Sequence, residues 1–552
     1  MSNKTYTSQE LGIHGTPSQT SLDNPGKPDI ANGEVVHSAS GHLDAVYGVG
    51  GVGHTQRRLK ARHVTFIGFG GGIGTGLFIG TGAALANAGP LGLLLAYSVV
   101  GLLLCSQVTV PNCWIIPHFA TRFVDPALGF TLAISYGYCY TIAIASEVSA
   151  AAIVVSYWTD ITPALVISIG LVAIFLINIA NVKFYGEAEV VTASIKILCF
   201  LGLIIVSIVI TAGGAPNHES VGFRYWKDPG PFVPYDGITG NKGNFLAFFS
   251  AFINASFSYI GVETVVVAAA ETENPHKSIP KAVKRVTYRI LFFYVLGTLL
   301  IGMIIPSNDP ALTSGTGNAN SSPFVIAIKN AGISVLPSIV NACILTSAWS
   351  AGNSYCYIGA RMIVAMAVDR QAPQCFAKVN RWGVPYLAVI VSFAFGPLAY
   401  LSLGSGGAAQ AFTWLLNLST VAGLLAWMTL CICYIRYHHA CIAQGVDRNN
   451  LPFKGRCQPL AAYVGAIGSG IIVIFSGFGV FIKGNWSTAD FIASYIGIVI
   501  YIAPYVFWKI FKSTKVSRSK DVDLFSGRFD ASSAPVEPIP TTAWGKFLDW
   551  LL

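Results

Sequence analysis

Charged residues are scarce in this sequence: Asp, Glu, Lys and Arg make up 11% of its 552 residues, whereas soluble domains carry about 25%. Hydrophobic residues make up 53%, and the mean hydropathy is +0.59. A surface with so few charges would not keep a chain of this length in solution, which excludes an ordinary soluble protein. Most segments are therefore expected to face lipid or one another inside a membrane.

Several functional signatures are also missing. The first apolar stretch begins only after about 62 polar residues, so no cleavable secretory signal is expected. There is no GxxxxGK[ST] motif and no strict GxGxxG after a strand, which disfavours nucleotide-driven pumping. The 11 cysteines fall in apolar stretches or on the predicted cytoplasmic side, so we expect no external disulfide framework. The sequence contains no cluster of metal ligands and no nucleophile motif, so we expect no enzyme, no metal site and no cofactor.

Twelve apolar stretches are present, each long enough to be a membrane-spanning helix of about 20 residues. They lie near residues 64–88, 91–111, 126–155, 163–181, 188–212, 246–270, 288–305, 334–357, 385–403, 410–435, 460–482 and 490–508. The sequence therefore predicts an all-α polytopic membrane protein. We expect a disordered N-terminal tail (1–62), a twelve-helix domain (63–508) and a C-terminal tail (509–552).

The basic residues predict the orientation. Of the 34 Lys and Arg, 28 lie in the two tails or in the even-numbered connections between spans. By the positive-inside rule these segments, including both termini, are cytoplasmic, which agrees with an even number of spans. The same excess explains the net charge of +9, so no nucleic-acid partner is expected.

The first of four unusual places is the glycine-rich stretch FGGGIGTGLF, Phe69–Phe78, in the first span. Each glycine inside a helix costs about 1 kcal/mol relative to alanine, so the composition disfavours a continuous helix there. An interrupted helix would present amide N–H groups at the positive end of a half-helix, where a carboxylate binds. The alternative is close helix packing through pairs such as Gly70 and Gly74, and composition leaves both interpretations open.

The second place is FSYIGVE, Phe257–Glu263, five spans later. Paired interruptions in matching positions of two halves are typical of inverted-repeat transporters. Glu263 lies within an apolar run, so it is either a functional carboxylate or a structural, hydrogen-bonded or protonated one.

The other two places are charges within spans. Lys196 is the only Lys or Arg placed deep inside a span, where it needs a partner or a cage of carbonyls, unless it snorkels to the interface. Glu147 lies in the third span, where a solvated and a buried role are equally open. Tyr136, Tyr138 and Tyr140 have period-two spacing and cannot all share one helix face.

The chain resembles the fungal amino-acid permeases of the amino acid–polyamine–organocation superfamily over about residues 58–530. The motifs that carry the resemblance are GGGIGTGLF (Gly70–Phe78), RFVDPALGF (Arg122–Phe130), YGEAE (Tyr185–Glu189), VGFRYWKDPG (Val221–Gly230), FSYIGVE (Phe257–Glu263), ETENPHKSIPKAV (Glu271–Val283) and LTSAWSAGNS (Leu345–Ser354). The resemblance implies a leucine-transporter architecture with two inverted five-helix repeats (63–212 and 245–435) and two extra helices (460–508). It also implies a plasma-membrane importer that couples an amino acid to protons and works by alternating access.

The resemblance also implies a site. The substrate carboxylate would meet amides of the first interruption and the ammonium would meet carbonyls of the second, so the implied substrate-binding residues are Gly71, Gly72, Ile73, Gly74, Thr75, Gly76, Phe257, Ser258, Tyr259 and Gly261. Lys196, Glu263 and Glu147 are the expected coupling residues, with a proton as coupling ion and no other cofactor. Lys196 matches a lysine that replaces the ion of sodium-coupled relatives, which favours protons.

One departure from the family pattern leaves alternatives open. Cys105 lies where most members carry a glutamate near the cytoplasmic gate, which affects the expected proton pathway and substrate charge. A receptor that binds amino acids and transports little, or a carrier of another small carboxylate or amine, is the alternative to an importer. The substrate and the bilayer are the expected partners, and the tails are candidate docking sites for trafficking or ubiquitination machinery.

Overall fold

A computed structural model describes residues 59–107, 116–272, 275–313, 322–404, 407–447, 457–524 and 542. These residues all belong to one compact unit, 39–552. They are almost entirely helical, and the bridge between Leu59 and Thr272 is the one β-contact that the described residues contain. The expected N-terminal tail lies outside the described residues except for 59–62.

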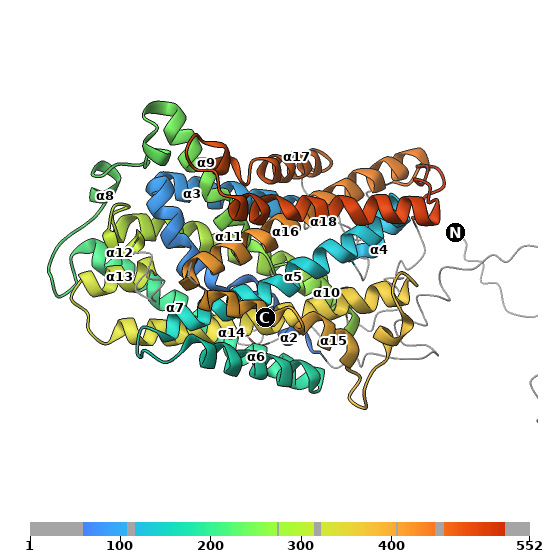
Figure 1. The fold of residues 1–552 in the computed structure, drawn as a ribbon, viewed down its shortest axis with the longest axis horizontal. Helices are drawn as coiled ribbons and strands as arrows, with labels where there is room; N and C mark the ends of the chain where they lie inside the picture. The colour runs from blue at the N-terminus through green and yellow to red at the C-terminus, as the bar shows by residue number, and fades with distance from the viewer. Residues whose placement is uncertain are drawn as a thin grey trace, which may run out of the picture. The chain divides into compact units, whose positions relative to one another are not determined.

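The first span is interrupted (Figure 1). Helix α2 (Ala61–Gly72) is followed by a π-helical turn, η1 (Gly76–Gly80), and by α3 (Thr81–Gln107). Within α3 the chain turns sharply at Gly89, the residue before Pro90. Gly89 has a left-handed backbone conformation, with a φ of +75°. The turn separates the end of the first span from the second span.

Four helices complete the first half. The chain continues with α4 (Ile116–Phe123), α5 (Pro126–Val155), α6 (Pro163–Ile179) and α7 (Val182–Ala212). Asp125 and Asn181 cap α5 and α7, because their side chains accept the N–H of the second helical residue at 3.0 Å.

The second half repeats the interruption. Helix α9 (Gly240–Tyr259) ends before the short α10 (Thr264–Val267) and η3 (Ala268–Glu271). The remaining helices are α11 (Pro275–Ile304), α12 (Pro310–Thr313), α13 (Pro323–Asn330), α14 (Leu336–Val368), η5 (Gln374–Ala377), α15 (Tyr386–Phe393), η6 (Gly396–Leu403), α16 (Gly407–Ala443), α17 (Leu460–Ile474), η8 (Phe478–Phe481) and α18 (Thr488–Lys512). Two small elements, α8 (Arg224–Lys227) and η2 (Tyr235–Gly237), lie between the halves.

Each predicted apolar stretch overlaps at least one of these helices. In the described residues, eight helices are long and apolar enough to cross a membrane, and α6 and α17 are shorter apolar helices. The first of the eight, Arg62–Ser106, contains two predicted stretches joined at the turn in α3. The prediction of an all-α polytopic membrane fold is therefore confirmed.

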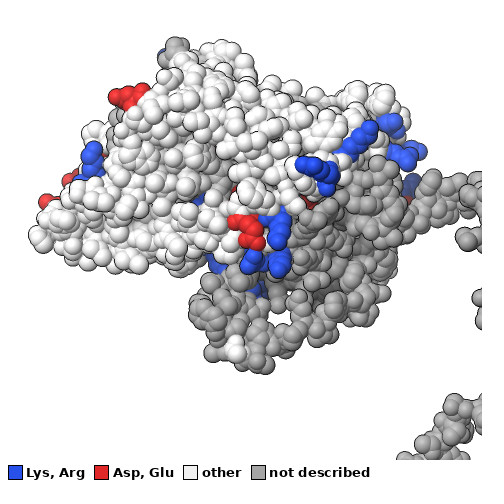
Figure 2. All heavy atoms as spheres, turned by 90° about the horizontal axis from the view of Figure 1, so that it is seen from below, with Lys and Arg blue, Asp and Glu red and all other residues white. Residues whose placement is uncertain are grey.

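Helix α5 lies at the centre and packs against α14, α16 and α18. Within its most apolar 18-residue stretch, 89% is buried. In Figure 1, α6 and α15 lie beside α14, while α17 and α18 lie beside α16. The most apolar 18-residue stretch of α18 is only 17% buried. Large exposed side chains of α18 are apolar, such as Ile510. Figure 2 shows a largely uncharged described surface with Lys and Arg gathered in a few clusters, as expected for a surface in contact with lipid.

The segment that follows α18, residues 513–524, packs against the end of α4 and the end of α16, and we call it the C-terminal strap. Asp523 pairs with Arg122 at 3.0 Å, and the side-chain amide of Gln444 donates to the Val522 carbonyl at 2.6 Å. Val522 and Leu524 are buried. The strap therefore contacts the RFVDPALGF motif through Arg122. Asp125 of the same motif pairs with Lys509 of α18.

Asp125 is almost fully buried beside this strap. Burial raises the pKa of its carboxyl, but hydrogen bonds from Lys509 and from the Ala127 N–H outweigh burial and hold the pKa below its usual value. The carboxylate is therefore charged and bound in the folded protein.

Candidate functional site

The end of α2 leaves four carbonyls without helical partners, and each receives a side-chain donor from another helix. The donors are Lys196 Nζ (2.7 Å from Gly70 O), Tyr355 Oη (3.4 Å from Gly71 O), Tyr294 Oη (to Gly72 O) and Ser347 Oγ (3.0 Å from Ile73 O). The ammonium of Lys196 also lies at the negative end of the helix dipole, which favours a cation. The carbonyl side of the first interruption is therefore fully bound by protein groups.

The amide side of the same interruption faces a carboxylate. The Thr75 N–H lies 3.4 and 3.3 Å from the two oxygens of Glu147, whose side chain is fully buried. A Cβ on Gly74 would lie 2.5 Å from Glu147 Oε1, so any other residue here would require the Glu147 carboxyl to shift. The Thr75 hydroxyl is buried without a hydrogen-bond partner among the described residues. These groups favour an anion at this end of the interruption.

The second interruption begins at Ile260, which is extended (φ −62°, ψ 135°), and continues through Gly261 at φ +100°. A Cβ on Gly261 would lie 2.7 Å from the carbonyl carbon of Gly71, so this left-handed turn packs directly on the end of α2. The two interruptions are therefore in contact.

The carbonyls of the second interruption also have donors. Tyr294 Oη lies 2.6 Å from Ser258 O, and Tyr355 Oη lies 3.4 Å from Ile260 O. The Phe257 and Gly261 carbonyls accept backbone N–H groups at 3.1 Å, from Ile260 and Thr264. A ligand ammonium at this position would share or displace these donors.

The predicted interruptions exist, but their limits differ from the sequence analysis. Gly71 and Gly72 lie in the last turn of α2 and offer carbonyls, whereas we expected them to offer amides. Phe257, Ser258 and Tyr259 likewise lie in the last turn of α9. Packing and side-chain donors stabilise these helical turns despite the helix cost of glycine, so the interruptions comprise Ile73–Thr75 and Ile260–Glu263.

Lys196 is fully buried, so it does not snorkel. Besides its bond to Gly70 O it interacts electrostatically with Glu189 and Glu147. Glu189 accepts hydrogen bonds at 2.8 Å from Ser350 and Asn353 of α14. The solvated alternative for Glu147 is excluded by its burial, and Lys196, Glu189 and Glu147 are three buried ionisable groups beside the first interruption.

Glu263 is separate from these three groups. Its Oε1 accepts hydrogen bonds from Tyr136, from Tyr140 at 2.8 Å and from the Trp427 indole at 3.3 Å. Its Oε2 is buried without a partner among the described residues. As expected from their spacing, Tyr136 and Tyr140 lie on one face of α5, whereas Tyr138 does not join them.

Sequence patterns did not indicate a role at the site for Glu189, Tyr294, Ser347 or Tyr355. Glu189 lies seven residues, or two helical turns, before Lys196, so helical periodicity could have placed both on one face. The two tyrosines carry no comparable signal, because a tyrosine in an apolar helix is as often a packing residue as a functional one. Cys105, the departure from the family pattern, is half-buried on α3.

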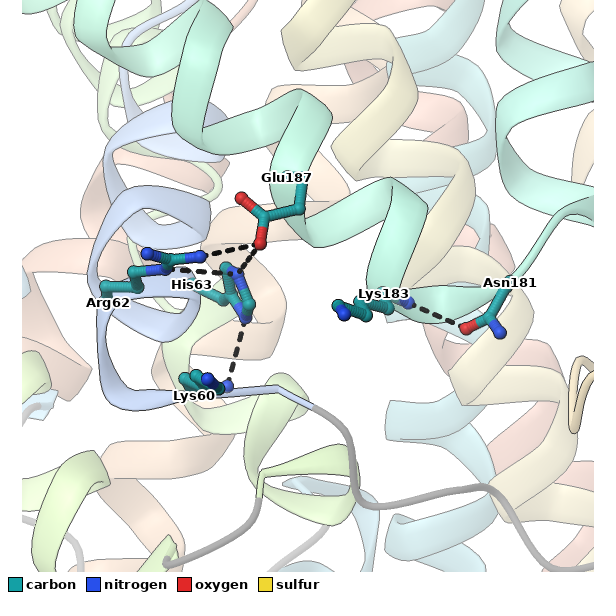
Figure 3. Close-up of polar contacts among 6 residues, drawn as sticks. All are labelled: Lys60, Arg62, His63, Asn181, Lys183 and Glu187. Atoms are coloured by element: carbon teal, nitrogen blue, oxygen red, sulfur yellow. Dashed lines mark hydrogen bonds and ion pairs between the residues drawn. The ribbon is translucent and has the colours of Figure 1, made fainter.

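A second contact joins the first turn of α2 to the second turn of α7 (Figure 3). Arg62 and His63 both reach Glu187 Oε1, at 2.7 and 3.1 Å. The Lys60 N–H donates to His63 Nδ1 at 3.0 Å, which completes the cap of α2. Together with the Lys196 bond to Gly70 O, this contact holds both ends of α2 against α7.

A solved structure has the same fold. The manganese transporter of Eremococcus coleocola superposes with a TM-score of 0.53 at 16% identity, covering 82% of this chain and 94% of that chain. The order of the helices and the paired interruptions define a polytopic membrane protein of the leucine-transporter type.

The comparisons with sequences are more specific. The amino acid permease family model matches residues 63–520. The dicarboxylic amino acid permease of Saccharomyces cerevisiae is 42% identical over 488 residues, covering 85% of this chain and 80% of the relative. The proline-specific permease of the same yeast is 42% identical over 528 residues, covering 90% and 83%. The chain belongs to the amino acid permease family, whose named relatives are transporters and not enzymes.

Proposed function

We propose that this protein imports an amino acid together with a proton by alternating access. The observation that carries the proposal is the pair of touching interruptions, one of which directs an amide at a buried carboxylate. Two half-helix ends of opposite polarity at one place suit the two charges of an amino acid. The names of the relatives support an amino-acid substrate, although two relatives of equal identity take dicarboxylic amino acids and proline.

In this proposal the substrate carboxylate binds at Gly74, Thr75 and Gly76, where the Thr75 N–H and hydroxyl are directed. The substrate ammonium binds at the carbonyls of Ser258 and Ile260, which carry exchangeable hydroxyl donors. Gly71, Gly72, Ile73 and the remaining predicted residues of the second interruption shape the site through their backbone.

Coupling follows from competition. Glu147 already accepts the Thr75 N–H, so an incoming carboxylate must replace it. A displaced, buried Glu147 is stable if it takes up a proton, and the Lys196 ammonium and the Glu189 carboxyl are the neighbouring groups whose charges influence that uptake. Glu263, with one buried and unpartnered oxygen, is the third coupling residue that we propose.

We place both termini in the cytoplasm by the positive-inside rule, because 28 of the 34 Lys and Arg lie in the two tails or in the even-numbered connections between predicted spans. We place the protein in the plasma membrane on its resemblance to importers. Both placements can be tested with epitope tags and selective permeabilisation.

Uptake tests the function. Cells that lack their own amino-acid permeases would express the protein and receive single radiolabelled amino acids over a range of external pH. Accumulation that rises with external acidity and is abolished by a protonophore is the expected result. Tight binding without accumulation would instead identify a receptor, and accumulation that a protonophore leaves unchanged would remove the proton from the mechanism.

A further inference from the structure

The hydroxyl of Tyr294 lies between the ends of the two interrupted helices. It donates to Gly72 O at the end of α2, and it also lies 2.6 Å from Ser258 O in the last turn of α9. Tyr294 itself belongs to α11, so a third helix supplies the only atom that is described within hydrogen-bond distance of both carbonyls.

A phenol carries one proton and can donate it fully to one acceptor at a time. When the Tyr294 hydroxyl points to Gly72 O, the facing lone pair of Ser258 O is free for another donor. When it points to Ser258 O, Gly72 O loses its donor. The state of one carbonyl therefore depends on the state of the other.

The surroundings of Tyr294 fix its ring. It is fully buried, and its ring packs edge-on against Tyr259 (4.5 Å, 82°) and Tyr97 (6.0 Å, 67°). Tyr259 in turn donates its hydroxyl to the Tyr97 carbonyl at 3.0 Å. Because the ring is held on two sides, the O–H bond can rotate while the oxygen stays between the two carbonyls.

We infer that Tyr294 is a positioning residue that joins the two interruptions and presents the Ser258 carbonyl to the substrate ammonium. This inference rests on the proposed function. An arriving ammonium bonds to Ser258 O and so keeps the Tyr294 proton on Gly72 O, which holds the end of α2 beside the loaded end of α9. The hydroxyl itself does not touch the substrate.

Tyr355 has the same arrangement with longer contacts. Its hydroxyl, from α14, lies 3.4 Å from both Gly71 O and Ile260 O. It therefore joins the neighbouring pair of carbonyls, and the same change at Tyr355 is expected to have the same direction of effect with a smaller size.

The test is Tyr294→Phe in the full-length protein, with Tyr501→Phe as a matched control. Tyr501 is also a tyrosine in a membrane helix, but its hydroxyl pairs with Thr429 at 2.5 Å, between α16 and α18. Uptake per inserted molecule would be measured against substrate concentration. In Tyr294→Phe the maximum rate is expected to fall at least tenfold, while the half-saturation concentration rises no more than twofold, because Ser258 O stays available to the ammonium.

Two results would overturn the inference. An unchanged maximum rate would mean that Tyr294 positions nothing, and a half-saturation concentration raised tenfold at an unchanged maximum rate would mean that the hydroxyl binds the substrate directly. If Tyr294→Phe does not insert, Tyr355→Phe decides: a lower maximum rate with unchanged half-saturation supports the inference, and wild-type kinetics contradict it.

Hydrogen exchange in purified, lipid-embedded protein separates this inference from the proposed function. Amides in peptides that cover 69–79 and 255–266 are expected to exchange at least tenfold faster in Tyr294→Phe than in wild type, with no change in Tyr501→Phe. If wild-type protein accumulates no amino acid, the proposed function fails while this exchange still reports on the link between the interruptions. Exchange equal to wild type in both peptides would contradict the link itself.

Discussion

Replacing Gly74 by alanine tests the carboxylate end of the site most directly. The new Cβ would lie 2.5 Å from Glu147 Oε1, about 1 Å inside van der Waals contact. A ligand carboxylate in the same position would meet the same methyl group. The variant can therefore keep a carboxylate on the Thr75 N–H only if that carboxylate shifts away from the new methyl group, which lengthens the hydrogen bond.

The size of the effect follows from the bond that is lost. A hydrogen bond to a charged group contributes about 1.5–3 kcal/mol, and about 1.4 kcal/mol is a tenfold change in affinity. We expect the half-saturation concentration of Gly74→Ala to rise at least tenfold and Gly74→Leu to abolish binding. Uptake kinetics and radioligand binding to the purified protein both measure this.

Gly202→Ala is the matched control, because Gly202 also lies in a membrane helix and a Cβ there would meet nothing within 4 Å. It is expected to bind like wild type. An affinity of Gly74→Ala within twofold of wild type, at equal expression, would show that no carboxylate binds at Thr75 and would refute the proposed orientation of the substrate.

Three other predictions concern charge and packing. Lys196→Ala should lower the accumulation ratio at least tenfold while binding changes less than threefold, and normal concentrative uptake would show that this lysine is structural. Asp125→Asn should lower the free energy of unfolding by about 1–3 kcal/mol at pH 7. Because the folded pKa of Asp125 is depressed, this stabilisation is complete above about pH 4 and is lost as the pH falls through the folded pKa. Thermal unfolding of the wild type and of Asp125→Asn from pH 7 to 3 measures the stabilisation. A stability difference between the two proteins that does not shrink in acid would contradict the prediction. Leu524→Ala in the buried part of the strap should cost about 2 kcal/mol, whereas Val516→Ala, at a residue that is 51% exposed, should cost little; equal melting temperatures of these two variants would show that the strap does not stabilise the fold.

The helices and the first interruption could be predicted from local signals, namely apolar runs and a glycine cluster. The second interruption has one glycine only and is predicted from its position five spans after the first. The limits of the interruptions could not be predicted. They depend on which carbonyls find a donor, and the donors Tyr294, Tyr355 and Ser347 come from helices far away in the sequence.

The buried charges show the same division. Lys196 and Glu147 stand out because a charge in an apolar run is rare, whereas Glu189 was missed because it lies at the edge of its run, two residues after the half-buried Glu187. Which of these charges meet depends on helix rotation, which the apolar pattern of a helix buried on several sides does not define. The sequence therefore indicated the participants better than their partners.

The four bound carbonyls at the end of α2 have a consequence for the unloaded protein. A carrier that releases its cargo inside the cell must turn back empty, and bare polar groups in the middle of a membrane would oppose that return. Here the lysine, the two phenols and the serine supply hydrogen-bond donors to those four carbonyls from within the protein, so their partners do not depend on a cargo. Cargo then has to compete with the resident donors, which favours quick release over tight retention.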